Sequence, residues 1–314
     1  MQDLVSAIAY HIIVYPLSLL PLGVIYLISD FFYLLLISVF PYRKEVIVRN
    51  IQNSFPDYTP QQIKQLRRSF YRHFADLLAE GIKNLSIREK ELRNRLRVSN
   101  PELLDELYEE KRNVLLVSGH YNNWEWLISA QNFLFKHQAV GIGTPLSNRF
   151  WNKKVNERRA RFGMRIIHAK DVKSFFSQSH EQAIATLILS DQAPGDARKA
   201  YWMNFLNQET PVLFGCEQLA HAYDQAVVFF HTSKVKRGHY EIELKLICRD
   251  ASQMNWGEIT EQHTRLLEEV IVDQPSYWVW SHKRWKRPRP DDLETLKTEQ
   301  KNKFNEKYKH AKTS

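Results

Sequence analysis

The sequence predicts an α/β protein, with a mixed, largely parallel sheet flanked by helices and an N-terminal hydrophobic helical segment that anchors the chain to a membrane. Two observations support this fold class. From residue 100 onward, short apolar runs alternate with helical patterns, as they do where helices cover a sheet. The first forty residues are instead almost entirely apolar. We therefore divide the chain into an anchor at 1–42, a globular domain at 43–290 and a charged tail at 291–314.

Length and composition limit the classes of protein that the chain can form. Its 314 residues, 44% of them hydrophobic, suffice for one large packed domain. The formal net charge of +9 indicates anionic partners, which include a phospholipid surface, an acidic carrier protein and nucleic acid. Cys216 and Cys248 lie outside any CxxC or Cys/His cluster. We expect both to be buried reduced thiols, in a protein whose working part faces the cytoplasm.

The N-terminal segment has the length and composition of a membrane anchor. Between Leu4 and Pro41 there is no lysine or arginine, and Asp30 is the only acid. The apolar run at 12–29 is close to the ~20 residues that cross a bilayer as a helix. A signal peptide would need a basic leader and a small-residue cleavage site, and the segment has neither. We expect membrane attachment, whether the segment spans the bilayer or lies in it.

Two features of this segment bear on its placement. Pro16 and Pro21 interrupt it, so the alternative to an anchor is a pair of buried core helices broken at the prolines. The C-terminal flank is basic, with Arg43, Lys44 and Arg49. Because basic flanks tend to remain on the cytoplasmic side, we expect the rest of the chain at the cytoplasmic face.

A long amphipathic helix is predicted within residues 55–85. Apolar residues recur there at helical spacing, at Ile63, Leu66, Phe70, Phe74, Leu77, Leu78 and Ile82. One side of the helix is strongly basic, with Lys64, Arg67, Arg68 and Arg72. This basic side is either a solvated face or a surface that lies against anionic headgroups.

Short apolar runs predict the strands of the sheet. They lie at 113–119, 137–143, 164–169 and 183–191, with helical patterns at 123–136, 149–162 and 258–272. Residues 226–248 predict a hairpin that turns at Arg237 and Gly238, because apolar and charged residues alternate in its second half. From Lys286 onward the chain holds nine Lys/Arg against five Asp/Glu, which is typical of a loose helix or a disordered tail.

One stretch, "NVLLVSGHYNNWEW" at 113–126, places His120 directly after a predicted buried strand. Open α/β sheets place their sites at the carboxyl ends of such strands. The following helix starts near Asn122 or Asn123, since asparagine is a good N-cap, so Glu125 lies in its first turn, where its carboxylate can reach back to the imidazole. A carboxylate bonded to one ring nitrogen fixes the tautomer and stabilises the imidazolium, which is what activation of a hydroxyl requires.

The same residues admit other interpretations. An H-x4-E spacing arises by chance in many chains, and His120 beside a helix start with a surface Glu125 is the structural alternative. A zinc pair is disfavoured, because i,i+5 is poor ligand spacing and no third ligand is evident. We therefore expect no metal at this position.

Several blocks of the sequence resemble one family. "SGHYNNWEW" resembles the H-x4-D/E block of the bacterial late lipid A acyltransferases, the lauroyl/myristoyl transferase family, which is related to the glycerolipid and lysophospholipid acyltransferases. One further block of the family precedes this one, "VRNIQNSFPD" at 48–57. Four more come after it in the family's order: "GTPLSNRFWNKKVNERRARFGMRII", "LILSDQAPG", "NQETPVLFGCEQLA" and "YWVWSHKRWKRP". The resemblance covers most of the chain. It implies a glycerolipid-acyltransferase-like sandwich, with residues 43–290 as the catalytic domain.

The resemblance also implies roles for individual residues. His120 would be the general base and Glu125 its catalytic partner. Arg159 and Arg161 would serve the second block in substrate binding, and Asp191 the third. Without the resemblance, the arginines at 158, 159 and 161 indicate only a solvated helix face, and Asp191 a turn residue. No metal or nucleotide cofactor is implied.

The function that follows is acyl transfer. The resemblance implies a membrane-bound O-acyltransferase at the cytoplasmic face of the bacterial inner membrane. Its donor would be acyl-acyl carrier protein, and its acceptor an anionic membrane lipid, a lipid A precursor. A lysophospholipid or aminolipid O-acyltransferase is the alternative within enzymes. A membrane-bound adaptor on a degenerate acyltransferase fold is the alternative outside them. The dispersed basic charge, with no recognisable motif, argues against a nucleic-acid binder.

Overall fold

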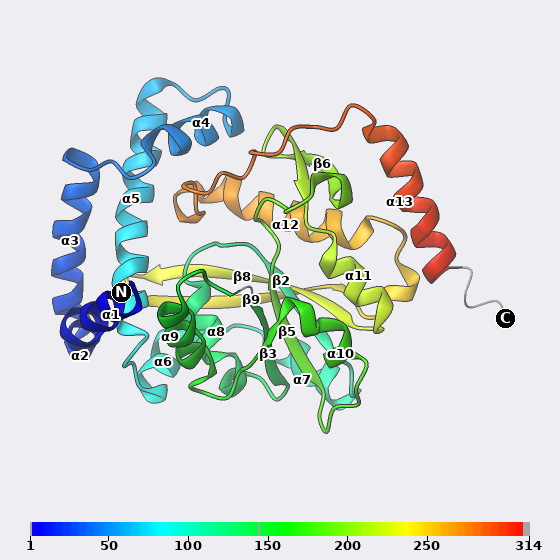
Figure 1. Cartoon of the computed structure of the whole chain (residues 1–314), viewed down its shortest axis with the longest axis horizontal. Coiled ribbons are helices and arrows are strands. Elements are labelled where there is room, and N and C mark those ends of the chain that lie inside the picture. Colours follow the sequence, from blue (N-terminus) through cyan, green and yellow to red (C-terminus); the bar gives the residue numbers. More distant parts are fainter. Residues whose placement is uncertain (1, 144, 310–314) are drawn as a thin grey trace.

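Seven strands form one sheet in the computed structural model, which describes residues 2–143 and 145–309 (Figure 1). The strands are β1 (Leu96–Val98), β2 (Val114–Ser118), β3 (Gln138–Gly143), β4 (Arg165–His168), β5 (Ile184–Leu189), β8 (Ala226–Lys236) and β9 (His239–Cys248). Their order is β1-β9-β8-β2-β5-β3-β4. Every neighbouring pair is parallel except the β8–β9 hairpin. The predicted mixed, largely parallel sheet is confirmed.

Alternate side chains of the central strand β2 face two helical layers. Val114 and Leu116 pack with Trp126 on one face, while Leu115 and Val117 pack with Ile259 on the other. All five residues of β2 are buried, which explains the continuous apolar run in the sequence. The first layer contains α6 (Glu89–Arg95), α7 (Glu102–Glu109) and α8 (Trp124–Leu134), and the second α11 (Gly215–Ala222) and α12 (Glu258–Asp273) (Figure 1).

The remaining elements flank this core. At the β4 edge lie α9 (Arg149–Ala160) and α10 (Val172–Phe176). The short 3-10 helices are η2 (Ala169–Asp171), η3 (Ala197–Lys199), η4 (Ala251–Gln253) and η5 (Pro275–Tyr277). A separate antiparallel hairpin pairs β6 (Tyr201–Phe205) with β7 (Gln208–Val212). Strand β6 buries all its residues except Asn204, whereas β7 buries only Thr210, Pro211 and Val212.

The N-terminal segment is a bent helical pair. It comprises α1 (Gln2–Ala9), a π-helical turn η1 (Tyr10–Val14), α2 (Tyr15–Leu19) and α3 (Leu22–Ser38). The chain bends by 120° between the arms Gln2–Leu19 and Leu22–Ser38. Leu20 is extended at the bend because the following Pro21 excludes it from helical geometry. No single helix in the described part of the chain is long and apolar enough to cross a membrane, although the bent pair together has a suitable length and composition.

One side of α3 packs on the long helix α5 (Pro60–Lys83), which follows α4 (Lys44–Ser54). Three hydrogen bonds converge on the buried carboxylate of Glu80: from Tyr26 Oη (2.6 Å), Asn123 Nδ2 (2.6 Å) and Tyr240 Oη (2.7 Å). Glu80 therefore joins α3, the loop after β2 and strand β9. The predicted amphipathic helix is confirmed, and its Thr59 cap accepts a hydrogen bond from the Gln62 N–H.

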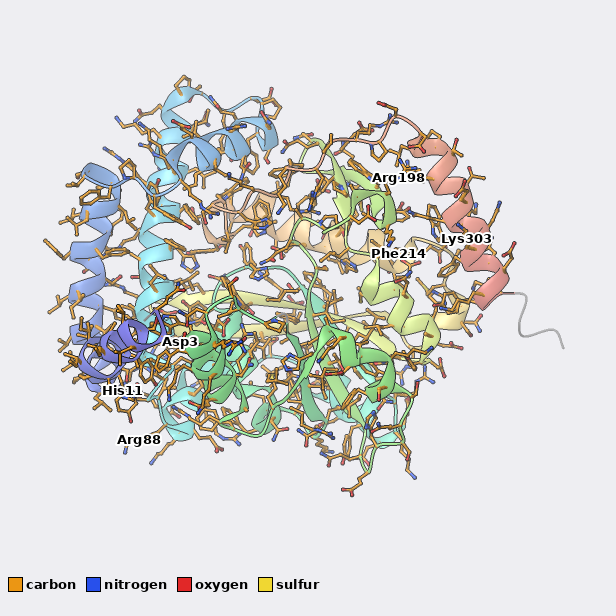
Figure 2. The ribbon with its side chains drawn as sticks, in the orientation of Figure 1. Asp3, His11, Arg88, Arg198, Phe214 and Lys303 are labelled. Carbon is orange, nitrogen blue, oxygen red and sulfur yellow. The ribbon has the colours of Figure 1, made fainter. Side chains whose placement is uncertain are left out.

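The charged C-terminal region forms a packed helix, α13 (Leu293–Tyr308). Leu293 and Phe304 are buried, and Phe304 contacts the ring of Phe214, which is labelled to the left of α13 in Figure 2. Two well-placed apolar residues thus dock a helix whose overall composition suggested disorder. Of the predicted tail, residues 310–314 lie outside the described part of the chain.

Candidate active site

His120 and Asp191 meet at the carboxyl edge of the sheet. His120 follows β2 and Asp191 follows β5, and these two strands are parallel neighbours. Their side chains join through His120 Nδ1 and Asp191 Oδ1, which lie 2.6 Å apart. The His120 backbone N–H also donates to Asp191 Oδ2, at 2.8 Å. Parallel strand pairing therefore brings together two residues that are 71 positions apart.

The Asp191 carboxylate is buried, and both of its oxygens accept hydrogen bonds. The indole N–H of Trp278 donates to its Oδ2 at 2.8 Å, and only 4% of the side chain is exposed. Burial by itself would raise the pKa of Asp191, but the nearby His120 and these hydrogen bonds outweigh burial and hold the pKa well below its ordinary value. Gly119 packs so closely that a Cβ there would lie 2.9 Å from Asp191 Oδ2. Asp191 is thus a fixed, ionised acceptor.

The second ring nitrogen of His120, Nε2, has no acidic partner among the described residues. Because Nδ1 donates to Asp191, the neutral ring carries its proton on Nδ1 and leaves a lone pair on Nε2. The Gln192 amide lies 3.2 Å from Nε2, and Trp124 meets the ring edge-on at 4.9 Å. The side chain of His120 is 19% exposed. This arrangement suits a general base that acts through Nε2.

The loop that carries His120 is held at several points. The Asn122 N–H donates to the Tyr277 carbonyl at 3.0 Å, and the Asn122 amide donates to the Thr232 carbonyl at 2.6 Å. Asn123 caps α8 by accepting from the Trp126 N–H at 3.0 Å. The cap was predicted, whereas the contacts to residues 277 and 232 come from distant parts of the chain.

Glu125 does not bond to the His120 imidazole, so the predicted His–Glu contact is wrong. Its carboxylate instead accepts from Arg158 and from Arg159 Nη2, the latter at 2.5 Å. The reason is geometric: the first turn of α8 directs Glu125 toward α9, and Asp191 from the neighbouring strand already occupies Nδ1. Burial by itself would raise the pKa of Glu125, but the two arginines outweigh burial and lower it.

Glu125 still acts on His120 through space. Burial by itself would lower the pKa of His120, but the negative charge of Asp191, with a smaller contribution from Glu125, outweighs burial and raises it above the ordinary value of 6.5. Asp191 therefore occupies the bonded position that the sequence had suggested for Glu125. Glu125 belongs to the surrounding electrostatic network.

The predicted substrate-binding arginines separate in the structure. Arg159 lines the cavity next to His120. Arg161 instead turns to the Leu85 carbonyl, to which its Nη1 donates at 2.7 Å, and its guanidinium lies 4.3 Å from the ring centre of Phe162. Arg158, whose role the sequence left open, pairs with Glu125 and is largely buried. No pattern in the sequence marked Gln192 or Trp278 as neighbours of His120 and Asp191.

A cavity of about 460 Å³ is lined in part by His120. Its polar lining includes His120, Arg159 and Gln192, and its apolar lining includes Ile128, Ile142, Met164, Ile166, Leu187 and Leu189. A Cβ at Gly141 would meet Met164 Sδ at 3.1 Å, so glycine keeps this wall clear. A second cavity of about 710 Å³ shares Ile142, Leu187 and Leu189 with the first. The site therefore offers apolar space beside a basic nitrogen.

Within the described residues there is no group of three His, Cys, Asp or Glu side chains that could hold a metal ion. Both cysteines are buried and unpaired, as expected for reduced thiols. Burial raises the pKa of the Cys248 thiol to about 11 and that of Cys216 further, so neither is a reactive thiolate.

Fold and site together define a class: an α/β enzyme with a histidine–carboxylate pair at the edge of a parallel sheet, next to an apolar cavity. The family model "bacterial lipid A biosynthesis acyltransferase" matches residues 3–287. The chain belongs to this family, and the resemblance seen in the sequence is confirmed. No individual curated protein matches it.

Proposed function

We propose that this acyltransferase moves a fatty acyl chain from acyl-acyl carrier protein to a hydroxyl of a lipid A precursor, with His120 as the general base. Family membership supports acyl transfer in lipid A biosynthesis. The observation that carries the residue assignment is the pairing of His120 Nδ1 with Asp191, which leaves the lone pair on Nε2 in a side chain that lines the cavity. Asp191 therefore takes the role of partner, and Glu125 positions arginines.

The proposed reaction is a single acyl exchange. Nε2 of His120 removes the proton of the acceptor hydroxyl while its oxygen attacks the thioester carbonyl. A C–O bond forms, the C–S bond then breaks, and the imidazolium returns the proton to the departing thiolate. Asp191, ionised and bonded to Nδ1, stabilises the imidazolium between these two proton transfers.

Arg159 is the proposed stabiliser of the developing negative charge. It lines the cavity beside His120, and Glu125 holds its guanidinium through Nη2 at 2.5 Å. A cation that is fixed before the reaction can stabilise an oxyanion without reorganising during it. The apolar cavities at this edge supply space for the acyl chain.

The proposed location is the cytoplasmic face of the inner membrane. Exposed apolar side chains concentrate on the N-terminal helices: Leu4, Val5, Ile8, Ile12, Ile13, Leu19, Leu27, Phe31, Leu34, Val39 and Phe40. Such a patch is unusual for a surface in water and suits burial in the hydrocarbon of a bilayer. The net charge of +9 would favour both anionic headgroups and an acidic carrier protein.

The test is mass spectrometry of lipids after incubation of the solubilised protein with acyl-acyl carrier protein. A lipid A precursor and a lysophospholipid serve as alternative acceptors, each beside the His120→Ala variant. A gain of one acyl chain by the lipid A precursor, absent in the variant, is expected. A gain by the lysophospholipid alone would favour the other acceptor class, and no turnover with either would favour a non-enzymatic adaptor.

A further inference from the structure

A different cavity, of about 620 Å³, lies against helix α5. Four cationic side chains line it, Lys64, Arg68, Arg72 and Lys234, and no acidic side chain does. None of its lining residues belongs to the cavity of His120. Such a concentration of positive charge in a concave site is typical of anion binding.

Three of the cations share one face of α5. Lys64, Arg68 and Arg72 are four residues apart, so they lie on successive turns, where like charges repel. Arg72 pairs with Asp30 at 3.0 Å. Lys64 and Arg68 have no acidic partner among the described residues. A bound anion would relieve a repulsion that the protein leaves uncompensated.

Lys234 and Arg72 are each held in place by an acidic partner. Lys234 Nζ donates to Asp76 at 3.2 Å, and the Lys234 side chain is only 13% exposed. The Arg72 guanidinium lies 5.3 Å from the ring centre of Tyr33 on α3, in addition to its bond with Asp30. The cavity therefore combines two exposed cations, Lys64 and Arg68, with two that already have acidic partners, Arg72 and Lys234.

His73 supplies an independent indication of a ligand. It lines the cavity, is only 3% exposed, and meets the ring of Tyr277 edge-on at 4.7 Å. Neither of its ring nitrogens has a hydrogen-bond partner among the described residues. A buried polar group without a partner is costly, so a ligand oxygen that accepts from the ring N–H would stabilise the site.

We propose that this cavity binds a phosphate monoester on the headgroup of the acceptor lipid; this inference rests on the function proposed above and adds a headgroup subsite to it. A phosphate monoester carries close to two negative charges and three strong acceptor oxygens, which match an array of arginine, lysine and imidazole donors. Its position beside α3 places the cavity next to the apolar patch of the N-terminal helices.

The cavity is also linked to the catalytic pair by one short segment. Tyr277 lines the cavity, and its carbonyl accepts from the Asn122 N–H in the loop of His120. The next residue, Trp278, donates to Asp191. An acceptor whose phosphate binds in this cavity would therefore contact Tyr277, which belongs to the same segment that hydrogen-bonds to the His120 loop and to Asp191.

The test compares acceptors with and without phosphate in full-length, detergent-solubilised protein. The variant is Lys64→Gln/Arg68→Gln, both exposed side chains. The matched control is Lys301→Gln/Lys303→Gln, which removes the same charge from α13. Lys303 lies at the opposite end of the molecule from His11 (Figure 2). The acceptors are a lipid A precursor and the same lipid after enzymatic removal of its phosphates.

The expected result is selective. The cavity variant should raise KM for the phosphorylated acceptor about tenfold or more, with little change in kcat. It should leave KM for the dephosphorylated acceptor unchanged. The control variant should leave KM for both acceptors unchanged. His73→Phe, which keeps a ring and removes the nitrogens, should raise the same KM. An equal effect on both acceptors, or no effect, would overturn the proposal. So would a rise only in KM for the carrier-protein donor, which would mark a protein-docking surface instead.

A binding measurement separates this proposal from the proposed function. Equilibrium binding of both lipids is measured on His120→Ala protein in micelles, with inorganic phosphate as competitor. Tighter binding of the phosphorylated lipid, lost in the cavity variant, supports the subsite even if no protein form transfers an acyl chain. Complete displacement by low-millimolar inorganic phosphate would show that free phosphate is the ligand and would overturn the headgroup assignment.

Discussion

At the scale of residues, the site contains two carboxylates, Asp191 and Glu125, that have different partners. Asp191 bonds to His120 and is nearly inaccessible to solvent, while Glu125 binds the side chains of Arg158 and Arg159. Both carboxylates add negative potential at the imidazole, but only Asp191 fixes its tautomer. Substitutions at the two positions should therefore have different consequences.

Asp191→Asn should reduce kcat by about 10²–10⁴-fold, the usual range for loss of general acid–base catalysis. The amide can present its NH₂ to Nδ1 and so favour the tautomer that lacks a lone pair on Nε2. Steady-state acyl transfer measures the effect, and Gln192→Ala, which leaves Nδ1 bonded, provides the comparison. Equal losses in the two variants would contradict the assignment of Asp191.

The pH dependence of kcat/KM follows from the raised pKa of His120. A general base must be neutral, so activity should fall as the pH drops through that pKa and rise toward a plateau above it. The midpoint is expected above 6.5, the ordinary value for histidine. In the residual activity of the Asp191→Asn variant, the midpoint should move to lower pH. Burial lowers the pKa of His120, and the variant lacks the negative charge of Asp191 that opposes this effect. A midpoint that stays fixed would mean that another group titrates.

Glu125→Gln should lower stability as well as activity. It leaves the Arg158 guanidinium, 12% exposed, without its carboxylate, and breaking a buried ion pair in this way costs about 3–5 kcal/mol. Urea unfolding measures the change in the free energy of unfolding. Adding Arg158→Gln should recover part of the loss, since the unpaired charge is then gone. No recovery would show that Glu125 stabilises the fold by other contacts.

At the scale of elements, α5 connects the N-terminal helices to the active site. Its Glu80 accepts from Tyr26 on α3 and from Asn123, which caps α8 next to Glu125. Burial by itself would raise the pKa of Glu80, and although its hydrogen-bond donors oppose burial, the net shift is upward. The carboxyl group thus joins the apolar segment to the loop of His120 within a buried network.

Tyr26→Phe should lower the free energy of unfolding by about 1–3 kcal/mol, because it removes one hydrogen bond from the buried carboxyl group of Glu80. Denaturant unfolding in detergent measures the loss. Tyr15→Phe, at an exposed position of α2, removes the same hydroxyl and should change stability little. Similar losses at both positions would indicate a general effect of the N-terminal helices.

The sequence predicted these elements unevenly. Strands β2 to β5, the β8–β9 hairpin and helices α5, α8, α9 and α12 were confirmed, because each has a strong apolar pattern. The pairing of β6 with β7 was not predicted. Helix α13 was left between a loose helix and disorder, because its order depends on the burial of Leu293 and Phe304 against other parts of the chain. Local composition does not report contacts of that kind.

At the scale of the whole molecule, the exposed apolar side chains of α1 to α3 lie at one end and the packed helix α13 at the other (Figure 1). If the apolar end enters a bilayer as proposed, helix α13 lies at the end of the molecule away from it. The bend at Pro21 then allows both arms to share one membrane surface without a straight span.

Leu27→Ser/Phe31→Ser should weaken binding to anionic phospholipid vesicles severalfold or more, because both side chains are exposed on α3 and would lose apolar burial in the bilayer. Vesicle co-flotation measures the binding. The control is Leu246→Ser/Val272→Ser, at exposed apolar positions elsewhere on the molecule. Unchanged flotation of the α3 variant would remove this face as the membrane contact.

The sequence by itself determined the α/β class, most of the sheet, the family blocks and the position of His120 at the end of β2, since these depend on local patterns. Only the tertiary structure decided which carboxylate bonds to His120. Glu125 is five residues away, but the start of α8 directs it to α9, whereas the β2–β5 pairing brings Asp191 to the ring from 71 positions away. Side-chain partners follow spatial neighbours, and strand order sets those neighbours independently of distance along the chain.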